Sequence, residues 1–101
     1  MSEAILPRPQ GLNSRGVDVS LLLARRVPWH SHTEITDDFV CMEGPMVVET
    51  RASRNEYVLQ PGQRCTVPPK TAHYVHGQDG GACRFMIVQG VGVYDYIAVG
   101  G

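Results

Sequence analysis

Residues that break regular structure recur along the whole chain, and they constrain its fold more than any other feature. Seven Pro and eleven Gly are spread over 101 residues, and no window of a dozen residues repeats apolar positions at helical spacing. Short apolar runs lie between the turn residues instead, as in sandwiches and barrels. We therefore predict strands at 17–25, 38–43, 46–50, 56–60, 64–67, 73–76, 83–89 and 93–99.

Many short strands without crossover helices predict an antiparallel barrel or sandwich. A chain of 101 residues suffices for one domain with one modest core. Residues 1–16 differ from the rest, because they are rich in Pro, Gly, Asn and Ser and contain little that a patterned core could bury. We interpret residues 1–16 as an irregular N-terminal arm, draped over a barrel edge or a neighbouring subunit, and residues 17–101 as the barrel domain.

The charge and cysteine content exclude several classes of protein. The net charge is −1, and among the scattered cationic residues only Arg25 and Arg26 are adjacent, so we expect neither nucleic acid nor an anionic membrane as a partner. No apolar run could span a bilayer, and the N-terminus does not resemble a secretory signal. Cys41, Cys65 and Cys83 are odd in number and widely spaced, which favours free thiols in a cytoplasmic protein.

Two histidines two residues apart are the first sign of a functional site. On a strand, His30 and His32 would point to the same face. Asp37 follows at the start of the next predicted strand, and His73 begins another. Three imidazoles and one carboxylate suit a divalent transition metal, namely Fe, Mn, Ni, Co or Zn, without deciding among them. Four protein ligands in an octahedral field would leave two positions for water or substrate.

The order and spacing of these residues resemble the two motifs of the cupins, roughly GxxxxxHxHxxxxExxxxxxG and GxxxxxPxGxxHxxxN. The chain reads His30-x-His32, four residues, Asp37, six residues and Gly44, and then Gly62, five residues, Pro68 and, five further on, His73. The resemblance covers residues 17–88, and the tail 89–96 is similar to that of small bacterial cupins with no assigned activity. It implies an all-β double-stranded β-helix, or jelly-roll barrel, with these His and Asp residues as metal ligands.

Four positions depart from the cupin motifs without removing a ligand. Asp37 stands where the family usually has Glu, so its carboxylate is one methylene shorter. Ala24 replaces the first Gly of the first motif. Lys70 replaces the Gly of PxG in the second motif, and Gly77 replaces its closing Asn.

Strand parity sorts the other candidate residues of the site. Phe39 and Cys41 share the parity of Asp37, so we expect them to line the same cavity or to pack in the core. Arg64 and Arg84 could offer positive charge to an anionic substrate in that cavity, or could lie on a solvated face.

The fourth histidine and the large aromatic residues are expected away from the ion. His76 has the opposite parity to His73 and should not be a ligand, and Trp29 should pack on the outer face or at a subunit contact. Tyr94 and Tyr96 fit packing at an edge or an interface.

The resemblance implies two kinds of function. Small cupins with such a ligand set include dioxygenases, isomerases and decarboxylases that act on small polar organic molecules. The alternative is a non-catalytic barrel that binds a small ligand or a metal, and the sequence does not decide whether the chain is an enzyme. A small barrel leaves sheet edges and apolar outer faces, so we also expect a homodimer.

Overall fold

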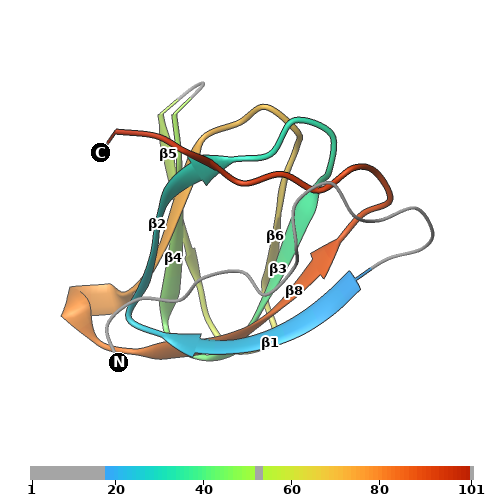
Figure 1. Ribbon diagram of the computed structural model, residues 1–101. Coiled ribbons are helices and arrows are strands. Elements are labelled where there is room, and N and C mark those ends of the chain that lie inside the picture. The colour runs from blue at the N-terminus through green and yellow to red at the C-terminus, as the bar shows by residue number, and fades with distance from the viewer. Residues whose placement is uncertain (1–17, 52–53, 101) are drawn as a thin grey trace.

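The computed structural model describes residues 18–51 and 54–100, and it arranges their strands in two antiparallel sheets that face each other (Figure 1). The strands are β1 (Asp18–Ala24), β2 (Arg26–Ser31), β3 (Asp37–Glu43), β4 (Met46–Thr50), β5 (Asn55–Leu59), β6 (Arg64–Val67), β7 (His73–Gly77), β8 (Cys83–Gln89) and β9 (Ile97–Ala98). A single 3₁₀ turn, η1 (Gln78–Gly80), connects β7 to β8. Within the described residues there is no α-helix, and hence none that could cross a membrane.

The topology is that of a jelly roll, as predicted. One sheet has the strand order β1-β8-β3-β6, and the other has the order β5-β4-β7-β2-β9. Strands that neighbour each other in a sheet are mostly distant in sequence, because the chain repeatedly crosses from one sheet to the other. The end of β2, the starts of β3 and β7 and the C-terminal segment lie at the same end of the barrel (Figure 1).

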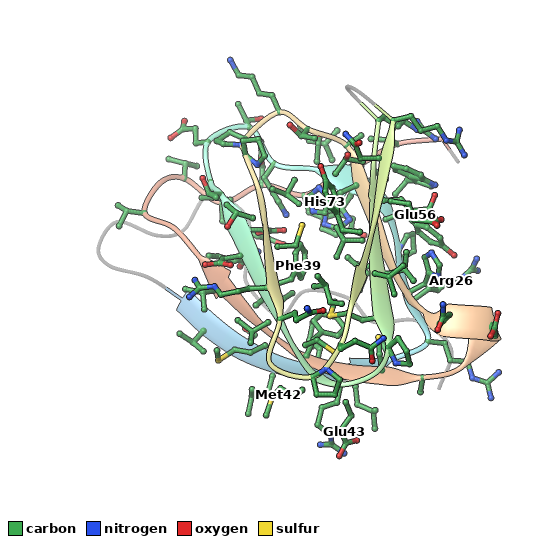
Figure 2. All side chains as sticks on the ribbon, turned by 180° about the vertical axis from the view of Figure 1, so that it is seen from behind. Arg26, Phe39, Met42, Glu43, Glu56 and His73 are labelled. Carbon is green, nitrogen blue, oxygen red and sulfur yellow. The ribbon has the colours of Figure 1, made fainter. Side chains whose placement is uncertain are left out.

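Alternating side chains from both sheets fill the space between them. On β8, Phe85 and Ile87 are buried while Arg84 is exposed, which is the pattern of a strand with one face on the core. The rings of Phe39 and Phe85 meet edge to face at 6.0 Å. Each such side chain contributes about 1.5–3 kcal/mol by leaving water. Figure 2 shows Phe39 between the sheets, below His73, so the apolar core lies next to the polar cluster described below.

Two predicted elements differ from the structure. The strand that carries His30 was not predicted separately, since the chain needs only Arg25 to pass from β1 to β2. The predicted strand 93–99 is reduced to β9, because the preceding segment runs across the barrel end (Figure 1) instead of pairing with a strand. The predicted N-terminal arm, 1–16, lies outside the described residues.

Candidate metal centre

The four predicted ligands come together at one end of the barrel. His30 lies on β2 directly opposite His73, the first residue of β7, and Asp37 is the first residue of β3. His32 follows the last residue of β2. The potential ligand atoms of these four residues all lie within 4.8 Å of one another. Each residue is at most 2% exposed, so the cluster is enclosed by protein.

Backbone carbonyls fix the orientation and tautomer of all three imidazoles. The acceptors are the carbonyl oxygens of Pro28 (2.7 Å from His30 Nδ1), Asp95 (2.5 Å from His32 Nδ1) and Thr71 (2.8 Å from His73 Nδ1). A carbonyl can only accept a hydrogen bond, so each Nδ1 must carry the proton. In the neutral rings, each Nε2 then has a lone pair available to an ion, which is the arrangement of metal-binding histidines.

These Nε2 atoms surround the Asp37 carboxylate. The Nε2 atoms of His32 and His73 each lie 3.0 Å from Asp37 Oδ2. The Nε2 of His30 is buried and has no hydrogen-bond partner within residues 18–51 and 54–100. A neutral Nε2 lone pair repels a carboxylate oxygen at this distance, so the cluster needs a proton or a metal cation among these atoms. The donor set, three nitrogens and one oxygen, fits a divalent transition metal ion.

The electrostatics of the cluster favour an ionised carboxylate. Burial alone would raise the pKa of Asp37, but hydrogen bonds and charge from His32 and His73 outweigh it and hold that pKa well below its usual range. Burial would likewise lower the pKa of His32, but its interaction with Asp37 raises it overall. For His30, burial, and then repulsion from His73, lower the pKa from 6.5 to about 3. His30 is therefore neutral at pH 7, as a metal ligand must be.

Gln89, at the end of β8, orients the carboxylate from its other side. Its amide Nε2 donates to Asp37 Oδ1 at 2.9 Å, and the two residues are opposite each other in the β3–β8 pairing. Gln89 is 2% exposed. Sequence reasoning missed this residue. A signal was present, because Gln89 continues the inward-facing row of Phe85 and Ile87 with a polar side chain.

The C-terminal segment covers the cluster, which the sequence interpretation of Tyr94 and Tyr96 missed. The ring of Tyr96 stacks on His30, with centroids 4.4 Å apart, and the ring of Tyr94 lies 5.3 Å from His32. Tyr94 is 1% exposed, so it is part of the core rather than of an edge. The Asp95 carboxylate accepts from the Thr33 amide at 2.8 Å and from the Thr33 hydroxyl at 2.5 Å. These contacts hold the segment over the site.

The loop before His73 explains one departure from the cupin motifs. Lys70 has a φ of +65°, the left-handed region that favours glycine, and it occupies the position of the motif Gly. Its backbone N–H donates to the carbonyl of His32 at 2.7 Å. The loop therefore keeps the glycine-like conformation with a lysine, and this hydrogen bond ties the two halves of the ligand set together.

The two apolar cavity candidates lie in the core beneath the cluster. The ring of Phe39 meets that of His73 at 5.8 Å, so it walls the cluster from below. Cys41 is buried, and burial raises the pKa of its thiol, so it remains protonated. Its sulfur is not among the grouped ligand atoms.

The two arginine candidates lie elsewhere. The side chains of Arg64 and Arg84 are 66% and 47% exposed, and they pair with Asp38 and Glu43 on the outside of the four-stranded sheet. His76 also points outward, where its Nε2 lies 2.7 Å from Glu49 Oε2, in agreement with the parity argument.

The comparisons with known proteins agree with this architecture. No protein-family model matches the chain, and no curated protein matches it. Among solved structures, a cupin-2 domain containing protein from Shewanella frigidimarina has 21% identity and a TM-score of 0.62, over 79% of this chain and 76% of that one. The chain has the cupin fold. A cupin domain from Bordetella pertussis has 19% identity and a TM-score of 0.57, over 86% and 90% of the two chains.

The protein NMB1881 from Neisseria meningitidis is similar at 18% identity, with a TM-score of 0.64 over 86% of this chain and 87% of that one. At these identities the likeness concerns the cupin fold alone. The evidence for a metal site therefore comes from the His-His-Asp-His cluster itself.

Proposed function

We propose that this cupin barrel holds one divalent transition metal ion through His30, His32, Asp37 and His73, and uses it to act on a small polar organic molecule. The observation that carries the proposal is the fixed tautomer of the three imidazoles. Each Nδ1–H is engaged by a backbone carbonyl, so that the Nε2 atoms and the Asp37 carboxylate converge as ligands. A barrel that needed only stability would have no use for this set.

The ligand set limits the chemistry without naming the metal. Fe, Mn, Ni, Co and Zn all accept imidazole and carboxylate ligands. Such an ion, when bound, supplies Lewis-acid or redox chemistry at its exchangeable positions, as dioxygenase, isomerase or decarboxylase reactions require. The chain itself contributes one negative charge from Asp37 and an aromatic wall from Phe39 and Tyr96. Because the ligand residues are enclosed by protein, only a small substrate could fit beside them.

A second function has its own support. The four ligand residues are at most 2% exposed, and Tyr94 and Tyr96 lie against them. A site so well covered also fits a non-catalytic barrel that binds a metal or a small ligand. Under the enzymatic proposal, the C-terminal segment must move to admit the substrate.

Metal content tests the first part of the proposal. The protein is purified without a metal-affinity tag and analysed for its elements, together with the double variant His30→Ala, His32→Ala. His76→Ala is the matched control, because His76 lies on the outer face. We expect about one equivalent of metal in the parent and the control, and none in the double variant. A metal-free parent, even after reconstitution, would refute the site.

The visible spectrum of the Co(II)-loaded protein then separates the two functions. Azide should change the spectrum if a coordination position can be reached from solvent. A spectrum that stays unchanged at high azide concentration would support the non-catalytic barrel and contradict the enzymatic proposal.

A further inference from the structure

A groove on the outside of the five-stranded sheet lies at the corner where β1 turns into β2. Its volume of about 410 Å³ is within the range of small-molecule sites, roughly 300–1,000 Å³. It is lined by Arg25 and Arg26, the adjacent cationic residues for which the metal site has no use. The other lining residues come from β4, β7 and η1, and they are Glu49, Tyr74, His76, Gly77 and Gly80.

The groove is separate from the His-His-Asp-His cluster. Along the pairing of β2 with β7, His30 is opposite His73 near one end, whereas Arg26 is opposite His76 near the other. The step from His73 to His76 spans about 10 Å along the strand. His73 is 1% exposed between the sheets, whereas the side chain of His76 is 23% exposed on the outer face. Figure 2 shows Arg26 on the outer side of the barrel, away from His73. A molecule in the groove would therefore not touch the metal ligands.

Gly77, which replaces the closing Asn of the second cupin motif, allows the backbone to pack tightly at this corner. A Cβ atom on Gly77 would lie 1.9 Å from the carbonyl oxygen of Gly81, so a residue with a side chain does not fit there. The Gly77 N–H donates to the carbonyl of Arg25 at 2.9 Å, and the Gln78 N–H donates to the carbonyl of Pro45 at 3.2 Å. These contacts hold η1 against the turn between β1 and β2, so the backbone around the groove is fixed.

Stacked rings form an aromatic wall of the groove. The ring of Tyr74 stacks on that of Trp29, with centroids 5.5 Å apart and planes 17° apart, and the ring of His76 lies 4.9 Å from Tyr74. The Arg51 guanidinium lies over the Trp29 ring, 4.3 Å from its centroid. Side chains that neighbours already hold in place lose little freedom when a ligand binds. Tyr74 and His76 therefore offer a preformed surface to the apolar part of a ligand.

The side chains that line the groove have a surplus of positive charge. The Nδ1 of His76 lies 2.8 Å from a backbone carbonyl oxygen, and its Nε2 lies 2.7 Å from Glu49 Oε2. Because the carbonyl can only accept, Nδ1 carries a proton, and a second proton must lie between Nε2 and the carboxylate. His76 and Glu49 are then neutral as a pair, whichever of them holds that proton. Arg25 and Arg26 add two positive charges, and Asp79 of η1 does not line the groove.

We propose that this groove binds a small organic anion, with a carboxylate or phosphate group against Arg25 and Arg26 and an apolar body along Tyr74. Guanidinium groups match the oxygens of either anionic group with paired hydrogen bonds. None of the described residues forms an ion pair with Arg25, so its charge is available to a ligand. The surplus positive charge selects an anion, and the aromatic wall selects an organic molecule over a bare inorganic ion.

Trp29 provides the signal for the test, because it is the only tryptophan of the chain and it stacks on Tyr74. Phenyl phosphate and benzoate are titrated into the full chain, both after metal removal and in the Zn(II)-loaded form, while the Trp29 emission is followed. We expect saturable binding with the same affinity in both forms. Inorganic phosphate should bind about tenfold more weakly than phenyl phosphate, because it has no apolar body. Whichever of phenyl phosphate and benzoate binds more tightly identifies the preferred anionic group.

The double variant Arg25→Gln, Arg26→Gln tests the assigned cations. It should weaken the binding of phenyl phosphate by about tenfold or more, because the charge-assisted hydrogen bonds are lost. The matched control is Arg64→Gln, Arg84→Gln, which removes the same charge from the outside of the other sheet. This control should bind phenyl phosphate as the parent does.

Four results would overturn the proposal. The first is the absence of saturable binding of both phenyl phosphate and benzoate. The second is binding to the Zn(II)-loaded form alone, which would assign the anion to the metal site. The third is equal affinity for inorganic phosphate and phenyl phosphate. The fourth is an equal affinity of the folded double variant and its control. If the double variant loses its native circular dichroism, Arg25→Gln alone replaces it; we then expect about threefold weaker binding, and an unchanged affinity would again refute the proposal.

Discussion

Replacing Gln89 by Leu should weaken metal binding by about 10- to 100-fold without removing a ligand. The Gln89 amide donates to Asp37 Oδ1 at 2.9 Å, and both residues are buried. A hydrogen bond to a charged group is worth about 1.5–3 kcal/mol, and each 1.4 kcal/mol corresponds to about tenfold in affinity. Leucine has a similar volume but no donor. The variant therefore leaves the carboxylate in place but less well oriented and less stable in its ionised form.

The affinity is measured by competition with a chelating dye, using Zn(II) and Co(II) in separate titrations. Gln60→Leu is the control, because Gln60 is exposed and directly follows β5, a strand that carries none of the four ligands. Its affinity should equal that of the parent. Urea unfolding of the metal-free proteins shows how much of the effect of Gln89→Leu is a loss of general stability.

An unchanged affinity in folded Gln89→Leu would refute the reasoning. It would mean either that Asp37 does not ligate the ion or that its orientation does not depend on Gln89. Parallel measurement of Asp37→Asn distinguishes these explanations. If Asp37 is a ligand, loss of its charge should weaken binding more than the loss of the Gln89 amide does.

Two further predictions concern pH and the covering segment. The pKa of His30 is 6.5 in the unfolded chain and about 3 in the folded chain. Between pH 6.5 and pH 3, the His30 imidazole is therefore protonated in the unfolded chain but neutral in the folded one. The free energy of unfolding of the metal-free protein should fall as the pH is lowered from 6.5 toward 3, by up to about 1.4 kcal/mol per pH unit. Urea unfolding at several pH values should show a weaker pH dependence of this free energy in His30→Phe than in the parent. Asp95→Ala removes both hydrogen bonds to Thr33, so metal transfer from the site to a chelator should become about tenfold faster. The transfer rate is measured by stopped flow. An unchanged rate would show that the C-terminal segment does not limit access to the site.

Most of the barrel could be predicted from the sequence, because turn residues separate its strands. Met46–Thr50, Arg64–Val67 and Cys83–Gln89 have the predicted bounds. Each is a short apolar run that ends at Gly, Pro or a polar turn. The break between β1 and β2 could not be predicted in this way, since no Gly or Pro separates Ala24 from Val27. Only the pairing of β1 with β8 and of β2 with β7 shows that the two strands belong to different sheets.

The spacing of the motifs was enough to predict the four candidate ligands, but it did not predict the residues that orient them by hydrogen bonds and ring contacts. Gln89 lies 52 residues from Asp37, and Asp95 lies 63 residues from His32. Contacts over such separations depend on the strand register, which a single sequence does not determine. The same limit applies to Tyr94 and Tyr96, whose positions depend on where the C-terminal segment crosses the barrel end.

The arrangement around Asp37 also implies that metal binding and folding are coupled. A buried polar group without a partner costs about 1–3 kcal/mol, and the Nε2 of His30 finds no partner in the part of the chain that the structure describes. The Nε2 atoms of His32 and His73 relieve their repulsion with Asp37 only when a proton or a cation lies among them. An ion bound by the fold and not by the unfolded chain adds about 2.7 kcal/mol of stability at a concentration of 100 Kd. Binding of an ion at this polar end of the barrel should therefore stabilise the whole fold.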